Sequence, residues 1–104
     1  DVAFHLGVLL SEMGYYAEAL EYYERSVGLY GPDPVVACNS SLCHYHLTHI
    51  EAALKEASKA LVLDPEYQNA RAMLIMLKKQ SNGRLDSESF QAKDTPGNIE
   101  TRRD

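Results

Sequence analysis

The strongest constraint on the fold is a resemblance between residues that stand 34 positions apart in the chain. Apolar residues recur at this distance, and so do small residues. The pairs include Ala3 with Ala37, Gly7 with Ser41, Val8 with Leu42, Ala19 with Ala53, Leu20 with Leu54 and Leu29 with Leu63. A fixed period of this length indicates stacked copies of one supersecondary unit, because a single unit cannot bury its apolar face alone.

Inside each period the apolar residues follow helical spacing. Ala3, Leu6 and Leu10 recur at steps of three and four, as on one face of a helix. Gly14 breaks this pattern, and so do the Gly and Pro residues of segment 31–34 and the Asp-Pro pair that follows Leu63. We therefore expect five helices, at about residues 2–13, 17–30, 35–47, 50–63 and 66–80.

The composition changes after Ser81. Segment 82–104 contains Gly83, Pro96 and Gly97, many Ser and Asp, and few large apolar residues. Low hydrophobicity without a period is typical of a disordered segment. We therefore expect a folded domain over residues 1–81 and a disordered tail over residues 82–104.

The motifs of the first period resemble those of the tetratricopeptide repeat family. They comprise Leu6-Gly7, Gly14-Tyr15-Tyr16, Glu18-Ala19-Leu20, Tyr22-Tyr23 and Leu29. The resemblance implies an all-α fold, with helix–turn–helix hairpins at about residues 1–33 and 34–66 and a C-terminal capping helix at about residues 66–80. It also implies that these elements follow the path of a right-handed α-solenoid.

The small residues of the motif have a physical role in this fold. A side chain larger than Gly7 or Ser41 would push apart the two helix axes of a hairpin. Two positions depart from the family pattern, because Ile75 stands where Gly7 and Ser41 stood and Thr48 replaces the expected Gly.

The resemblance implies a non-enzymatic module that binds a protein or peptide in a concave groove, which the first helix of each pair lines. The expected groove residues are Phe4, His5, Val8, Val35, Asn39, Leu42, Tyr45, Met73 and Met76. Some relatives clamp a chaperone's terminal carboxylate with two Lys, one Arg and two Asn, and here only Asn39 fits that set. An apolar strip usually marks an interaction site, so we expect an apolar peptide or an amphipathic helix as the ligand.

Two alternatives stay open at this point. The apolar residues can pack against further repeats or against a second copy of the chain, which would make a homodimer. The segment can also be an accessory domain of a larger enzyme or co-chaperone.

Composition weighs against several other functions. The formal net charge of −5 disfavours nucleic acid, whose phosphates require positive side chains. The sequence has no apolar run of about 20 residues, so we expect no insertion into a membrane. Cys38 and Cys43 lie on different faces of one expected helix, which favours free thiols and a cytoplasmic location.

The sequence offers no set of residues with a catalytic or metal-binding pattern. His44, His46 and His49 are close in sequence, but a zinc site needs about four ligands that converge on one point. We find no phosphate-binding loop and no nucleophile motif. We therefore expect neither an enzyme nor a bound cofactor.

Overall fold

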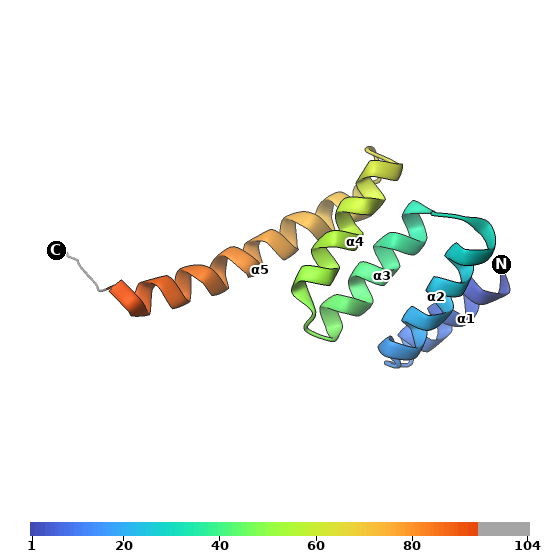
Figure 1. Cartoon of the computed structure of the whole chain (residues 1–104), viewed down its shortest axis with the longest axis horizontal. Helices are drawn as coiled ribbons and strands as arrows, with labels where there is room; N and C mark the ends of the chain where they lie inside the picture. Colours follow the sequence, from blue (N-terminus) through green and yellow to red (C-terminus); the bar gives the residue numbers. More distant parts are fainter. Residues whose placement is uncertain (94–104) are drawn as a thin grey trace.

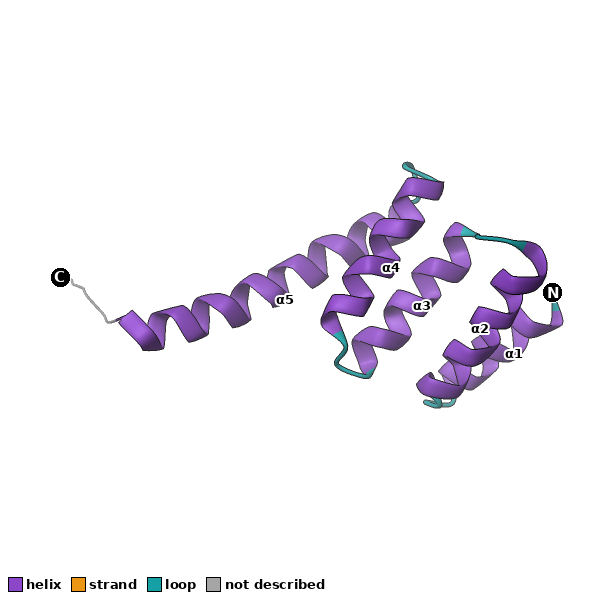
Figure 2. Ribbon diagram, viewed as in Figure 1, coloured by secondary structure: helices purple, strands orange, loops and turns teal. Residues whose placement is uncertain are grey.

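The computed structural model describes residues 1–93, with side chains described for residues 1–81. All regular elements in this range are helices, and the described chain contains no strand (Figure 2). They are α1 (Val2–Glu12), α2 (Tyr16–Tyr30), α3 (Pro34–His46), α4 (Ile50–Leu63) and α5 (Gln68–Lys93). The expected all-α class is confirmed.

The helices form two antiparallel hairpins, α1 with α2 and α3 with α4, followed by α5. The hairpins stack through α2 and α3, and α5 packs against α4 and α3 (Figure 1). The first hairpin lies at one end of the stack, and α5 extends away from it at the other end. No helix within residues 1–93 has the length and hydropathy required to cross a membrane. The right-handed solenoid path stays a prediction.

The last helix differs from the sequence-based expectation at both ends. It begins at Gln68 and not at residue 66, because the Asp64 carboxylate accepts a hydrogen bond from the Glu66 amide at 3.1 Å and holds a turn there. It continues to Lys93, through residues expected to be a disordered tail. A single Gly83 costs a helix only about 1 kcal/mol, and the chain has no proline between Pro65 and Pro96. The expected tail over residues 94–104 lies outside the described residues.

The junction between the hairpins is specified by a helix cap. The Asp33 carboxylate accepts hydrogen bonds from the amides of Val35 at 2.8 Å and Val36 at 3.3 Å. Pro34 opens α3, where its missing amide hydrogen has no partner to lose. These two residues start α3 as the sequence predicts.

The turns inside the two hairpins have matching hydrogen bonds. In the first turn the Tyr15 amide donates to the Leu10 carbonyl at 2.8 Å, and in the second the His49 amide donates to the His44 carbonyl at 2.8 Å. Both turns place one residue at positive φ, Gly14 at 88° and Thr48 at 64°. Glycine suits this left-handed conformation, whereas a β-branched threonine is strained there.

In each hairpin the two helices pack closely at a small residue of the first helix, in α1 or in α3. A Cβ atom on Gly7 would lie 2.5 Å from Cε1 of the Tyr23 ring, so the ring occupies the space that a side chain would need. In the second hairpin the buried Ser41 hydroxyl donates to the Ala53 carbonyl at 2.7 Å. Ile75 stands at the corresponding position of α5 and is exposed, because no described second helix packs on that face.

Candidate functional site

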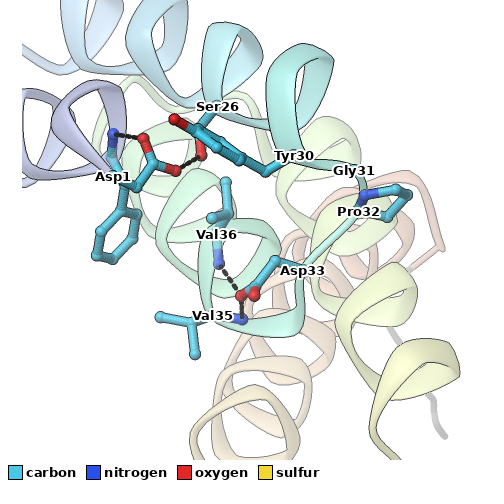
Figure 3. A pocket seen from close by; sticks show the side chains of 9 residues that line it. Asp1, Ser26, Tyr30, Gly31, Pro32, Asp33, Val35 and Val36 are labelled. Atoms are coloured by element: carbon cyan, nitrogen blue, oxygen red, sulfur yellow. Dashed lines mark hydrogen bonds between the residues drawn. The ribbon is translucent and has the colours of Figure 1, made fainter.

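Two hollows follow one another along the surface between α1 and α3, and we call this surface the groove. The first has a volume of about 310 Å³ and lies where α1 and α3 begin (Figure 3). It is lined by Asp1, Phe4, Ser26, Tyr30, Gly31, Pro32, Asp33, Val35 and Val36. The second has a volume of about 430 Å³ and lies toward the ends of the same two helices. It is lined by Val8, Ser11, Glu12, Tyr16, Tyr23, Asn39, Leu42, Cys43 and His46.

The polar atoms of the first hollow are already engaged in hydrogen bonds. The Asp1 carboxylate accepts from the Phe4 amide at 3.1 Å and from the Ser26 hydroxyl, so it caps α1 and ties α1 to α2. The Asp33 carboxylate caps α3, as described above. Figure 3 shows both carboxylates held in this way at the rim of the hollow. The side chains left to contact a ligand there are mainly apolar, above all Phe4 and Val35.

The second hollow has an aromatic floor and an apolar wall. Tyr23 lies at its base, and burial raises the pKa of the Tyr23 phenol. The Tyr16 ring stacks on the His46 ring with 4.5 Å between their centroids. Leu42 is 45% exposed and Val8 is partly buried on opposite sides. This hollow therefore offers an apolar, partly aromatic surface that remains open to solvent.

Five of the nine expected groove residues line these hollows, and the structure brings them together along α1 and α3. They are Phe4, Val8, Val35, Asn39 and Leu42. Phe4 and Val8 also pack against the core cluster of Ala19, Tyr23, Val36 and Cys43. Val35 is 40% exposed, which together with Leu42 gives the groove its two most accessible apolar side chains.

The other four expected residues lie elsewhere. His5 is exposed, and its Nδ1 lies 2.7 Å from the Asp1 carbonyl oxygen. Met73 is buried at 8% exposure in the cluster formed with Ile50, Ala53, Ala57 and Leu77, and Tyr45 and Met76 pack against it. The Tyr45 hydroxyl is also 3.4 Å from Nε2 of Gln80. These three residues therefore hold α5 against the second hairpin and contribute little free surface.

Several residues that line the hollows were not among the expected groove residues. Ser11 and Tyr16 line the second hollow, and Ser26 and Tyr30 line the first. Tyr16, Ser26 and Tyr30 belong to α2, whereas the groove was expected to be lined by the first helix of each pair. No pattern in the sequence marks these α2 residues as part of the groove.

The buried thiols are unsuited to nucleophilic chemistry. Burial raises the pKa of the Cys43 thiol to about 11 and also raises the pKa of the Cys38 thiol. Both cysteines are free and buried. Since the thiolate is the nucleophile, neither residue is activated at neutral pH.

The histidines do not converge with further ligands. The rings of His44 and His49 are 6.0 Å apart, whereas His46 stacks on Tyr16. Burial lowers the pKa of the His44 imidazole, and its Nδ1 is buried with no hydrogen-bond partner among the described residues. Within the described part of the chain, no group of three or more His, Cys, Asp or Glu side chains has an arrangement that would hold a metal ion.

Comparison with known proteins agrees with the hairpin architecture. A family model described as Tetratricopeptide repeat matches residues 1–32, which comprise α1 and α2. No curated protein matches the chain. The second hairpin repeats the first at a spacing of 34 residues, with Ser41 buried at the place of Gly7 and Ala53 buried at the place of Ala19. The matched model shows that the first hairpin is similar to a tetratricopeptide repeat, and the second hairpin repeats its spacing and its small buried residues.

Proposed function

We propose that this chain is a non-catalytic adaptor that binds an apolar segment of a partner protein in the groove between α1 and α3. Tetratricopeptide repeats are in general modules for binding proteins, and their stacked helices provide extended concave surfaces. The observation that carries the proposal is the pair of hollows, with Val35 exposed in the first and Leu42 exposed in the second.

The charges around the groove favour one kind of segment. Neither α1 nor α3 contains a Lys or an Arg. Glu12 lies at the second hollow, and the carboxylates of Asp1 and Asp33 lie at the first. An acidic rim around an apolar floor favours a ligand with apolar side chains flanked by Lys or Arg. The free thiols of Cys38 and Cys43 support the cytoplasmic location expected from the sequence.

Two synthetic helical peptides test both parts of this proposal. They share one face of Leu and Ala, and their opposite faces carry either Lys or Glu. We expect fluorescence anisotropy to show that the Lys peptide binds more tightly at low salt, because its charge complements the rim. Equal affinity for both peptides would disprove the charge preference, and no binding of either would disprove an apolar helix as the ligand.

One substitution locates the binding surface. Leu42→Gln should weaken binding of the Lys peptide roughly tenfold, because burying one Leu side chain contributes about 1.5–3 kcal/mol. The neutral glutamine keeps the charge of the groove unchanged. Val62→Gln is the matched control, since Val62 of α4 is 81% exposed and lines neither hollow. Equal losses in the two variants would place the contact outside the groove.

A further inference from the structure

Four apolar side chains form a stripe along the side of α1 that faces away from the stack. They are Val2, Leu6, Leu9 and Met13, the last at the C-cap, with exposures of 75%, 38%, 55% and 62%. Their spacing places them on one face of the helix. Phe4 and Val8, which line the groove, lie on a different face. The stripe is therefore a second surface, independent of the proposed groove.

The same positions are covered in the other two helices of this register. In α3 they are Val36, Ser40 and Cys43, all buried, and Val36 and Cys43 pack with Ala19 and Tyr23 of α2. In α5 they include Ala70 and Leu77, both fully buried, and Leu77 packs with Ala53 and Ala57 of α4. At both internal junctions this face is covered by the preceding hairpin, mainly by its second helix. The α1 stripe has the same register, but no helix within residues 1–93 packs on it.

The opposite end of the stack does not offer a matching surface. The face of α5 that corresponds to Gly7 and Ser41 carries Arg71, Ile75 and Lys78, and all three are exposed. Packing this face on the stripe would desolvate an ammonium and a guanidinium without acidic partners on the stripe, which is unfavourable. Head-to-tail association is therefore disfavoured, whereas the stripe itself contains no charged residue.

We propose that the stripe is the contact surface of a homodimer, in which α1 packs antiparallel on α1 of a second copy. The stripe is symmetric about its centre, because Val2 and Met13 are equally far from the midpoint and so are Leu6 and Leu9. In an antiparallel pair Val2 of one copy therefore meets Met13 of the other, and Leu6 meets Leu9. Such a contact is isologous and closed, and each stripe is covered by a helix of the other copy.

The oligomeric state of the purified 104-residue chain tests this contact. Sedimentation equilibrium should give twice the mass of the chain at high concentration. Leu9→Glu should weaken the dimer by at least about tenfold, because a buried unpaired carboxylate is unfavourable. Val62→Glu, on an exposed site of α4, and Leu42→Gln, in the groove, should leave the dimer unchanged. The mass of a single chain at every concentration, or equal effects of Leu9→Glu and Val62→Glu, would overturn the proposal.

Disulfide trapping tests the orientation of the two helices. Val2→Cys and Met13→Cys are each expected to form no cross-link alone, since identical positions lie about 16 Å apart in the antiparallel pair. A mixture of the two variants should form a cross-linked heterodimer on mild oxidation. Cys38 and Cys43 are buried and serve as an internal background. A mixture of Met13→Cys with Val62→Cys is the control. The antiparallel arrangement would be overturned if either variant cross-links with itself. It would also be overturned if the mixture of Val2→Cys with Met13→Cys forms no more cross-link than the control.

Discussion

In the first hairpin Gly7 of α1 lies against the ring of Tyr23 in α2, whereas the second hairpin has Ser41 at the place of Gly7 and Ala57 at the place of Tyr23. A residue without a side chain thus contacts a large ring in one hairpin, whereas in the other a small polar residue donates to the Ala53 carbonyl and the ring is replaced by a methyl group. All four residues are buried. The comparison teaches that the helix spacing depends on the volume of the pair and not on either residue alone.

The largest expected difference in stability between the hairpins comes from truncating Tyr23 in the first and Ala57 in the second. Tyr23→Ala should lower the free energy of unfolding by about 3–5 kcal/mol, because Gly7 has no side chain with which to fill the cavity. Ala57→Gly in the second hairpin removes only one methyl group and should cost about 1 kcal/mol. Urea denaturation followed by circular dichroism measures both values. Similar losses in the two variants would contradict the different roles assigned to the two positions.

A smaller difference in stability between the hairpins is expected from substitutions at Gly7 and Ser41, in the first helix of each hairpin. Gly7→Ala should destabilise the fold by about 1–3 kcal/mol, because the new Cβ would lie 2.5 Å from the Tyr23 ring. Ser41→Ala should cost about 1 kcal/mol, the contribution of one hydrogen bond. The double variant Gly7→Ser with Tyr23→Ala copies the second hairpin into the first. Its loss of stability, measured by the same denaturation, should be smaller than the sum of the losses of Gly7→Ser alone and Tyr23→Ala alone.

The smallest effect concerns the joint between the hairpins, where Cys43 of α3 packs with Ala19 and Tyr23 of α2. Burial raises the pKa of this thiol from 9.0 to about 11, so above pH 9 the unfolded chain loses a proton that the folded chain keeps. Stability contributed by the protonated thiol is therefore complete below pH 9 and falls as the pH rises toward 11. From pH 8 to pH 10 the loss should be roughly 1 kcal/mol.

Denaturation at the two pH values checks this effect in the native chain and in Cys43→Ala. The variant retains every other titrating group, including Tyr23, so the difference between the two slopes isolates the thiol. Identical slopes would contradict a raised pKa at Cys43.

The sequence was sufficient to predict the five helices, because the 34-residue period, the Asp33–Pro34 start and the small residues at Gly7 and Ser41 are all local signals. It did not predict the length of α5, since composition distinguishes a disordered segment from a helix poorly when no proline intervenes. The expected groove included five residues that line the hollows, but also His5, Tyr45, Met73 and Met76, which do not. Register gives a position on a helix, whereas burial depends on which neighbouring element covers that position.

The turn between α3 and α4 carries a further consequence. Thr48 adopts a left-handed backbone conformation like that of Gly14, although this conformation is unfavourable for a β-branched residue. The backbone hydrogen bonds that flank the two turns match. The conformation at Thr48 is therefore imposed by the ends of the two helices and not by the residue that adopts it. In such a repeat the residue type at this turn position is a poor predictor of the turn conformation. A residue other than glycine there does not indicate a different loop.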